Sequence, residues 1–269
     1  MHADQISLCL ALQDLGINAE LIPTALNFPT HLEPRDYYDI AEVPRVLHYH
    51  SNIDACGFLN PIQNTSVDQQ IGYVNEIIRS RRRNQLDNRV FWDFRYAAFP
   101  ELGSGAGSRG AELSRKCAIL NEALSHQGEA RLLDIGCGDL EVTKHLVIKA
   151  YKGIDISAEA VRICRAKRPD WDFAVGHPLL LDIQPAEIVL CLDVLIHMPD
   201  IESYRRMVRR LIELTSNVLI VGAYNQPPWL TSDITFYYEP ITKSLREGGM
   251  TTFEILGGYR DTTVIRAFK

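Results

Sequence analysis

Residues 131–141 read RLLDIGCGDLE, and this short stretch determines how the rest of the chain is interpreted. Its apolar first half predicts a strand, which leads directly into the glycine turn Gly136–Gly138 and then into a predicted helix. Nucleotide-binding α/β units require this order, because their glycines follow a strand and open a helix. A second stretch, residues 103–110, also matches G-x-G-x-x-G, but it follows Pro100, which interrupts any strand there. The first stretch is therefore the predicted ligand-binding turn.

From residue 116 to the C-terminus, predicted helices and strands alternate. Apolar runs predict strands over residues 130–136, 151–156, 171–176, 186–194 and 217–224. Apolar residues at helical spacing predict helices over residues 116–127, 139–150, 157–168, 200–215 and 242–249. This alternation predicts a doubly wound α/β fold, a mostly parallel sheet with helices on both faces. Residues 251–268 hold two strands with no helix between them, so one of these must run antiparallel.

The first part of the chain lacks this regular pattern. Residues 1–65 alternate short elements with proline-rich joints and predict a small N-terminal α/β segment. Residues 66–115 predict a helical lead-in followed by the glycine-rich loop, and residues 116–269 form the predicted core. His48 and His50 share one face of a predicted strand and could bind a metal, but no third ligand is evident, so no metal site is predicted.

The composition of the chain excludes some classes of function. Its 269 residues carry a formal net charge of −6, which argues against broad binding to nucleic acid. No run of about 18 apolar residues occurs, so no transmembrane helix is predicted. The six cysteines are scattered without a C-x-x-C pair. This pattern predicts free thiols and a cytoplasmic protein.

Acidic residues around the glycine turn indicate which ligand it binds. Asp155 ends the next predicted strand, at about the spacing of 20 residues expected for a carboxylate that binds a ribose diol. Glu141 stands where a dinucleotide-binding loop has its third glycine, and Asp134 and Asp139 crowd the turn. These carboxylates would repel a pyrophosphate, which disfavours a nicotinamide-dependent oxidoreductase. S-adenosylmethionine suits them better, because it has a sulfonium, an ammonium and no phosphate.

Three motifs occur in order: LDIGCGD at residues 133–139, GIDIS at 153–157 and LCLDVLIH at 190–197. Together they resemble a class I S-adenosylmethionine-dependent methyltransferase, over roughly residues 100–269. The resemblance implies a seven-stranded sheet whose last strand is antiparallel.

The resemblance also implies roles for individual residues. The glycine turn would pass under the methionine part of the cofactor, Asp134 and Asp139 would hold its ammonium group, and Asp155 would bind the ribose. His177 stands where the family has an acid beside the adenine, and Arg109 could pair with the methionine carboxylate. The implied cofactor-binding residues are Arg109, Asp134, Gly136, Cys137, Gly138, Asp139, Asp155, Ile156, His177, Leu192 and Asp193.

Two further stretches carry weaker resemblances. The loop ELGSGAGSRG, at residues 101–110, follows an F-W-D-x-R-Y sequence, and the pair resembles methyltransferases of bacterial glycan biosynthesis. The loop would then be a lid over the cofactor, the alternative being a flexible linker. Residues 2–58 resemble the C-terminal part of a GT-A glycosyltransferase without its nucleotide-binding half. This implies a fused or associated glycosyltransferase as a partner.

Methyl transfer to an alcohol requires a group that removes the acceptor's proton. His197, after the fourth core strand, is the first candidate for this base, and Asp193 would contact the cofactor or orient the base. Glu239 is the second catalytic candidate, because its carboxylate could bind sugar hydroxyls.

Aromatic residues are candidates for the wall of the acceptor pocket. Trp229 and Tyr224 are predicted there, whereas Trp92 and Tyr96 are predicted mainly to pack in the core.

The predicted function is O-methylation of a sugar or glycan hydroxyl. Two alternatives remain open. One is a methyltransferase for a small molecule or a protein, and the other is a non-catalytic cofactor-binding or glycosyltransferase-associated module.

Overall fold

The structure, a computed structural model, describes residues 28–29, 47–48, 52–54, 57–85, 87–125, 127–226, 229–230 and 235–269. The chain forms two compact units, Met1–Glu76 and Ile77–Lys269, within each of which the residues contact one another far more than they contact the other unit. The prediction divided it at residues 65 and 115 instead. The glycine-rich loop therefore belongs to the same compact unit as the sheet. Residues 1–27 of the predicted N-terminal α/β segment lie outside the described residues.

The first unit contains two very short parallel strands and the start of a long helix. β1 (Phe28–Pro29) pairs with β2 (Leu47–His48). His48 lies in β2, whereas His50, its partner in the considered metal pair, lies outside the described residues. Within the described ranges, no group of three or more His, Cys, Asp or Glu side chains is placed to hold a metal.

The helix α2 (Thr65–Gln85) confirms the predicted helical lead-in. Val67 and Ile71 are buried against Leu59, which precedes the helix. Asn75 fixes this contact with two hydrogen bonds, since its amide Nδ2 donates to the Leu59 carbonyl and its Oδ1 accepts from the Leu59 amide, both at 3.0 Å. The segment before α2 is thus held against the helix by the packing of Leu59 and by its two backbone hydrogen bonds with the Asn75 side chain.

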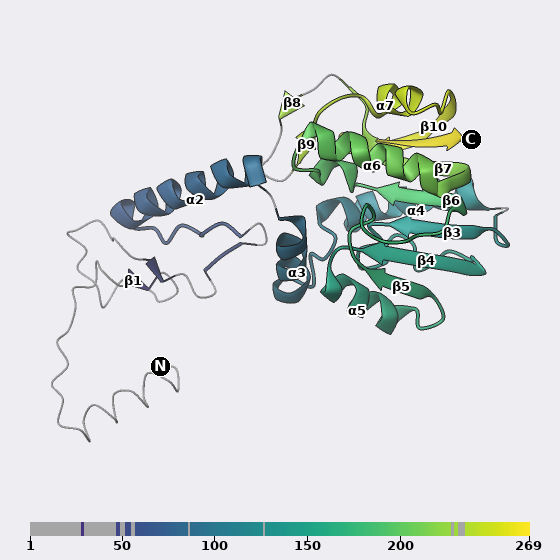
Figure 1. Cartoon of the computed structure of the whole chain (residues 1–269). Helices are drawn as coiled ribbons and strands as arrows, with labels where there is room; N and C mark the ends of the chain where they lie inside the picture. The colour runs from purple at the N-terminus through teal and green to yellow at the C-terminus, as the bar shows by residue number, and fades with distance from the viewer. Residues whose placement is uncertain are drawn as a thin grey trace. The chain divides into compact units, whose positions relative to one another are not determined.

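The second unit is built on a seven-stranded sheet (Figure 1). In spatial order its strands are β10 (Thr252–Tyr259), β11 (Thr262–Phe268), β7 (Thr215–Tyr224), β6 (Ala186–Leu192), β3 (Arg131–Ile135), β4 (Ala150–Asp155) and β5 (Asp172–Val175). Neighbouring strands are parallel except at β11, which runs antiparallel to both β7 and β10. This confirms the predicted doubly wound fold with an antiparallel last strand.

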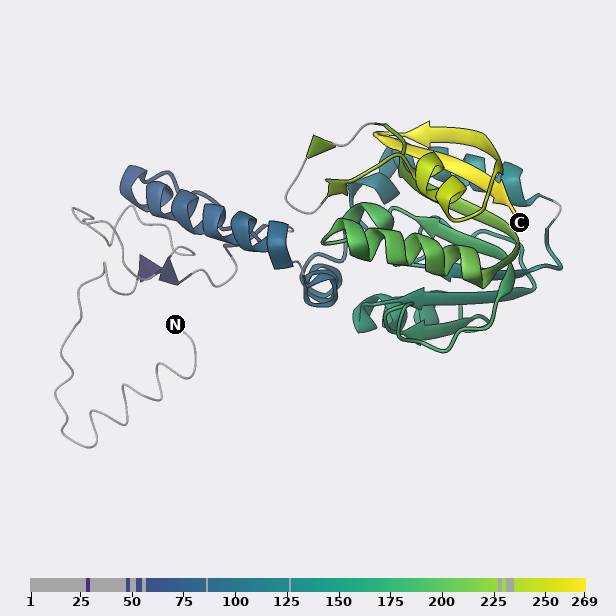
Figure 2. The ribbon, with the colours of Figure 1, turned by 45° about the horizontal axis from the view of Figure 1, so that its top comes forward.

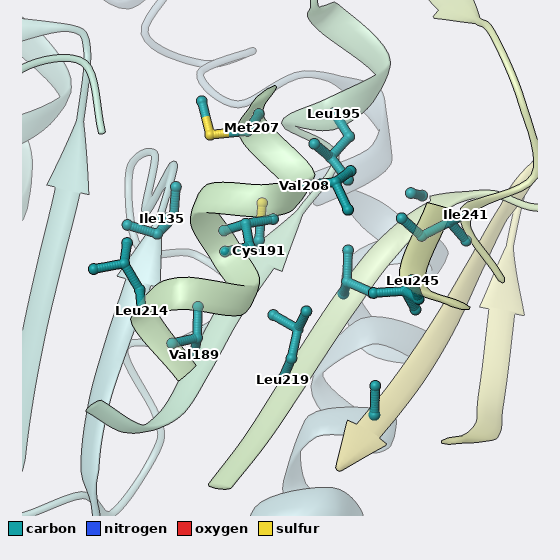
Figure 3. Close-up of a cluster of buried hydrophobic side chains, with 14 of the residues drawn as sticks. Ile135, Val189, Cys191, Leu195, Met207, Val208, Leu214, Leu219, Ile241 and Leu245 are labelled. Atoms are coloured by element: carbon teal, nitrogen blue, oxygen red, sulfur yellow. The ribbon is translucent and has the colours of Figure 1, made fainter. Parts of the chain in front are cut away.

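Helices cover both faces of the sheet, as the alternating side chains of its strands require. On one face α6 (Ile201–Leu214) and α7 (Ile241–Glu247) pack on Ile135, Cys191 and Leu219 (Figure 3). On the other face α4 (Gly110–Leu124) and α5 (Ala158–Lys167) pack on the intervening strand residues, such as Leu132 and Leu190. In Figure 2, α6 crosses in front of the strands and α4 is seen behind them.

The helix predicted over residues 139–150 does not form. A succession of turns runs from Gly136 to Thr143 and beyond, and Leu140 has a φ of 63°, which a right-handed helix cannot contain. Leu140, Leu146 and Ile148 are nevertheless buried on the face that carries α4 and α5. The apolar residues that suggested a helix are therefore buried in the core, although their backbone is not helical.

The helix α3 (Asn88–Ala98) is attached to the sheet through the start of α5. The Oδ1 atom of Asp93 accepts from the Ser157 hydroxyl at 2.6 Å and from the Glu159 amide at 3.2 Å. Ser157 is the N-cap of α5, and its hydroxyl oxygen accepts from the Ala160 amide at 3.1 Å. Asp93 therefore fixes α3 beside the carboxyl end of β4.

Short elements complete the second unit. They are the 3-10 turns η2 (Ala106–Ser108) and η3 (Leu195–His197) and the antiparallel pair β8 (Trp229–Leu230) and β9 (Phe236–Tyr237). None of the helices in the described ranges is both long and apolar enough to cross a membrane.

Leu211 and Ile201 lie on the same predicted apolar stripe of α6, but Leu211 is fully buried whereas Ile201 is 38% exposed. We expect Leu211→Ala to lower the free energy of unfolding by about 2–5 kcal/mol, because it removes packed methyl groups and leaves a cavity. Ile201→Ala should cost less than about 1 kcal/mol. Urea unfolding of both variants measures these free energies. Equal losses of the free energy of unfolding would show that Leu211 and Ile201 do not differ in burial as the structure describes.

Candidate functional site

A cavity of about 990 Å³, counting its open mouth, lies at the carboxyl ends of the central strands. Parallel α/β sheets bind ligands at this edge. All the predicted site residues except Arg109 and Glu239 line it: Asp134, Gly136, Cys137, Gly138, Asp139, Asp155, Ile156, His177, Leu192, Asp193 and His197. The fold thus brings together residues that are far apart in the sequence.

The carboxylate of Asp155, at the end of β4, is held by two backbone donors. Its Oδ2 accepts from the Gly138 amide and its Oδ1 from the Ser157 amide, both at 2.9 Å. Burial raises the pKa of this carboxyl to about 6, with a further contribution from the nearby charge of Asp93. Each oxygen keeps a lone pair for a further donor, so the carboxylate can accept hydrogen bonds from a pair of hydroxyls.

The glycine turn is covered by the loop that the sequence analysis interpreted as a lid. Gly138 has a φ of 56°, and a Cβ there would clash with the Ser104 hydroxyl and lie 3.0 Å from the Tyr96 hydroxyl. Ser104 also donates to Asp139 at 2.8 Å. Ser104 and Ser108, both from the loop, line the cavity. Glycine is therefore required at position 138 for its backbone conformation and for the close approach of the loop.

Asp134 is an enclosed acid of the site. It is 4% exposed, and the Tyr151 hydroxyl donates to its Oδ2 at 2.5 Å. Tyr151 is itself fixed by stacking on Trp171, with ring centroids 3.8 Å apart. Burial raises the pKa of Asp134 to about 7, although the bond from Tyr151 opposes this shift. Near neutral pH this acid is therefore close to its own titration point.

Arg109 lies outside the cavity lining. Its guanidinium forms an ion pair with Asp139 and donates to the carbonyls of Glu101, at 3.0 Å, and Ser108, at 2.9 Å. These contacts fasten the loop to the glycine turn. The predicted pairing of Arg109 with a methionine carboxylate stays a prediction, and within the protein the guanidinium is paired with Asp139.

The sequence analysis missed Lys116. This lysine lies on α4 and lines the cavity although it is only 2% exposed. It forms an ion pair with Asp193, donates to the Ser108 hydroxyl at 3.1 Å and lies over the Tyr259 ring at 4.4 Å. A signal was present, because Lys116 interrupts the apolar face of α4 one turn before Leu120.

Asp193 occupies a strained position directly after β6. Its φ is 60°, and its Oδ1 accepts from the Tyr259 hydroxyl at 2.9 Å and from the Thr262 hydroxyl at 3.3 Å. Non-glycine residues in this region of backbone space need strong support from their surroundings. Here the support comes from the ends of β10 and β11 together with Lys116, and it aims Asp193 at the cavity.

His197 lines the cavity beside α3. The Asn88 amide Nδ2 donates to the His197 carbonyl at 2.8 Å, and the ring centroids of Trp92 and His197 are 5.1 Å apart in an edge-to-face arrangement. Asn88, Trp92 and Tyr96 all line the cavity. The spacing of four residues places these three side chains on one helix face, which could have indicated a shared cavity. The sequence instead led us to predict mainly core packing for Trp92 and Tyr96.

Glu239 is not part of this cavity. Its two oxygens accept from Arg205, Lys243 and Ser244 at 2.9–3.1 Å, and the bonds from Arg205 help to lower its pKa to about 2. The carboxylate holds the start of α7 against α6, which corrects its predicted catalytic role.

The predicted aromatic wall is only partly described. Tyr224 is buried and stacks on Tyr237, with ring centroids 3.9 Å apart, and it does not line the cavity. The side chain of Trp229 lies outside the description.

The charge of the lining fits a cationic ligand. The acids Asp134, Asp139, Asp155 and Asp193 face the cavity, and the only lysine or arginine among the described lining residues is Lys116, which is already paired. Among these lining residues a pyrophosphate would find several carboxylates and no unpaired lysine or arginine. An ammonium and a sulfonium would find compensating charge, and a ribose would find the held carboxylate of Asp155.

Comparisons with known proteins agree with this geometry. Residues 133–219 match a family profile described as "Methyltransferase domain". None of the curated proteins compared with this sequence matches it significantly. The matched stretch includes the glycine turn, Asp155 and Asp193. It is a methyltransferase domain with S-adenosylmethionine as its methyl donor, and the chain is therefore an enzyme of this class.

Solved structures share the fold at low sequence identity. A putative O-methyltransferase of Nostoc punctiforme PCC 73102 is 12% identical with a TM-score of 0.52, and the match covers 74% of this chain and 68% of that chain. Magnesium protoporphyrin IX methyltransferase of Synechocystis PCC 6803, with bound S-adenosylhomocysteine, is 18% identical with a TM-score of 0.48, covering 77% and 100%. DesVI of Streptomyces venezuelae is 13% identical with a TM-score of 0.48, covering 60% and 93%.

We expect the affinity for S-adenosylhomocysteine to fall about tenfold between pH 7.5 and pH 5.5. The ligand's ammonium and ribose favour ionised carboxylates, and the pKa values of Asp155, about 6, and Asp134, about 7, lie in this window. In the cofactor-free protein both values exceed those of an unfolded chain, about 4. Its free energy of unfolding should therefore fall as the pH rises through the same window.

Calorimetric titration across this pH range checks the expectation. Asp155→Asn should weaken binding and flatten the pH dependence, whereas Asp172→Asn, which changes an exposed acid at the start of β5, should leave both unchanged. If the affinity of Asp155→Asn and of Asp134→Asn depended on pH as steeply as that of the wild type, the assignment of these two carboxylates to the cofactor would be contradicted.

Proposed function

We propose that the chain transfers the methyl group of S-adenosylmethionine to a hydroxyl of a sugar or glycan, with His197 as the general base. The observation that carries this proposal is that His197 and Trp92 line the same cavity as Asp155 and the glycine turn. A cofactor seated on Asp155 and a hydroxyl beside His197 would thus share one enclosed space. Enclosure of both reactants aligns them and excludes water, which are the two requirements of methyl transfer.

On the cofactor side, the chain supplies fixed acceptors of hydrogen bonds. Asp155 is positioned for the ribose hydroxyls, and Asp134 and Asp139 for the ammonium group. Asp193 continues this acidic lining toward the acceptor side, where the supports from Lys116 and Tyr259 prevent it from rotating away. The cofactor supplies an activated methyl carbon bonded to a positively charged sulfur.

On the acceptor side, His197 is positioned to take the proton of the attacking hydroxyl. The hydroxyl oxygen forms a bond to the methyl carbon as the carbon–sulfur bond breaks, and the electron pair of that bond stays on sulfur. Trp92 offers an apolar surface beside His197, of the kind on which a sugar ring packs. The bond from Asn88 to the His197 carbonyl keeps η3 in place while the proton moves.

The same proposal extends to the biological setting. The resemblance of residues 2–58 to the end of a GT-A glycosyltransferase supports a fused or associated glycosyltransferase as the source of the acceptor. The scattered cysteines support a cytoplasmic site of action.

We expect His197→Ala to lower kcat by about 10²–10⁴-fold, the usual contribution of a general base. The affinity for S-adenosylhomocysteine should stay unchanged, because the proposal assigns the cofactor to Asp155 and the glycine turn and not to His197. His145→Ala is the matched control, since His145 is exposed on the turns that follow the glycine loop. Release of S-adenosylhomocysteine in the presence of nucleotide sugars and glycans provides the assay.

The outcomes separate the two parts of the proposal. Turnover with sugars that survives His197→Ala at full rate would remove His197 as the base. Binding of S-adenosylhomocysteine together with turnover only of proteins or of acceptors that are not sugars would refute the sugar assignment and leave methyl transfer intact.

A further inference from the structure

Arg95 on α3 is a buried cation without an anionic partner. The residue is 8% exposed, its Nε is buried without a hydrogen-bond partner, and no ion pair joins its guanidinium to any residue that the structure describes. A guanidinium is always charged and carries five N–H donors. A buried charge that is not compensated is strongly destabilising, so such a group is retained for a purpose other than the stability of the fold.

A second arginine of this unit, Arg168, has partners that compensate its charge. Arg168 lies 3.5 Å from the centroid of the Trp171 ring, forms an ion pair with Asp170 at 2.7 Å and donates to the Lys144 carbonyl at 3.0 Å. Arg95 has only the aromatic part of this arrangement, with its Cζ 5.5 Å from the Trp92 ring centroid. An aromatic face holds a guanidinium in orientation but does not accept its N–H bonds as an anion does.

Arg95 itself does not line the cavity, but its neighbours on α3 and on the glycine-rich loop do. Its aromatic neighbour Trp92 and the next residue, Tyr96, line the cavity, as does Ser104. The Nη2 atom lies 3.5 Å from the point that a Cβ on Gly105 would occupy, so the absence of a side chain at Gly105 leaves room beside the guanidinium. The charge therefore lies between α3 and the lid loop.

Asn88 provides a second unpartnered group on the same helix. Its Nδ2 donates to the His197 carbonyl, but its Oδ1 is buried and accepts no hydrogen bond. Asn88 lines the cavity beside the proposed base, so an acceptor hydroxyl that reaches this side chain would supply the donor that its Oδ1 lacks. Seven residues separate Asn88 from Arg95, which corresponds to about 10 Å along the helix axis.

We propose that the methyl acceptor is an acidic hydroxyl compound, whose phosphate or carboxylate group is bound by Arg95 while a hydroxyl group contacts Asn88 near His197. This inference rests on the proposed function and narrows its substrate class from sugars in general to sugars that carry an anionic group. Trp92, between the two polar groups, contacts the body of the acceptor. Arg95 supplies recognition and no step of the methyl transfer.

The first test compares Arg95→Met with the matched control Arg168→Met by thermal unfolding without ligand. Arg95→Met should leave Tm unchanged or raise it, because the variant removes a buried charge that nothing compensates. Arg168→Met should lower Tm by about 2 °C or more, because it leaves the partners of Arg168 unsatisfied. A fall of Tm in Arg95→Met as large as in the control would make Arg95 structural and overturn the inference.

The second test measures anion binding to the protein saturated with S-adenosylhomocysteine, at constant ionic strength. Inorganic phosphate should raise the Tm of the wild type and of Arg168→Met by about 2 °C, and should have no effect on Arg95→Met. Arg95→Lys should retain part of the response. Glucose 1-phosphate, glucuronate and glucose, compared in the same way, distinguish a phosphate from a carboxylate, and neutral glucose should give the smallest shift.

Two results would overturn the inference: no response of the wild type to any of the anions, or an equal response in Arg95→Met. The proposed function fails separately, since it requires S-adenosylhomocysteine to bind in the first place. Binding of S-adenosylhomocysteine without any response to anions refutes only the acidic acceptor.

Discussion

The carboxylate of Asp155 is the point through which the cofactor side of the site is assembled. Its two oxygens accept the amides of Gly138 and Ser157, and so connect the glycine turn after β3 to the start of α5. Ser157 in turn donates to Asp93, which fixes α3 beside the same strand end. One acid thus positions the floor of the cavity directly and, through Ser157, the helix that carries the acceptor-side residues. Loss of this carboxylate would affect both halves of the site.

This arrangement has an electrostatic cost that a bound cofactor offsets. Asp134 and Asp155 are both buried, and burial, with a smaller contribution from neighbouring carboxylates, raises their pKa values toward neutrality. A ligand that brings positive charge lowers that cost, whereas an anionic dinucleotide would add to it. Lys116 does not change this balance, because its charge is already used by Asp193. The preference for a sulfonium cofactor is therefore a property of the charges built into the cavity wall.

The acceptor side follows a different principle. Its polar groups on α3 are incompletely paired, as the free Oδ1 of Asn88 and the uncompensated guanidinium of Arg95 show. Fixed hydrogen-bond partners hold the acids of the cofactor side in place, whereas the unpaired groups of α3 leave bonds to be made by a ligand. The glycine-rich loop of residues 101–110 joins the two sides, since Ser104 contacts Asp139 and Tyr96 while Gly105 leaves space beside Arg95.

The amino-acid sequence by itself determined the sheet, its antiparallel last strand, and the acids and glycines that line the cavity, because these depend on local periodicity and on residues next to strand ends. It did not determine the backbone of residues 139–149, where a positive φ at Leu140 replaces a predicted helix although the same apolar residues are buried. Only the tertiary structure removed Glu239 from the site, by pairing it with Arg205, and placed Trp92 and Lys116 on the cavity. Those outcomes depend on contacts between distant segments, and the side-chain pattern of a single segment does not specify which partner it will meet.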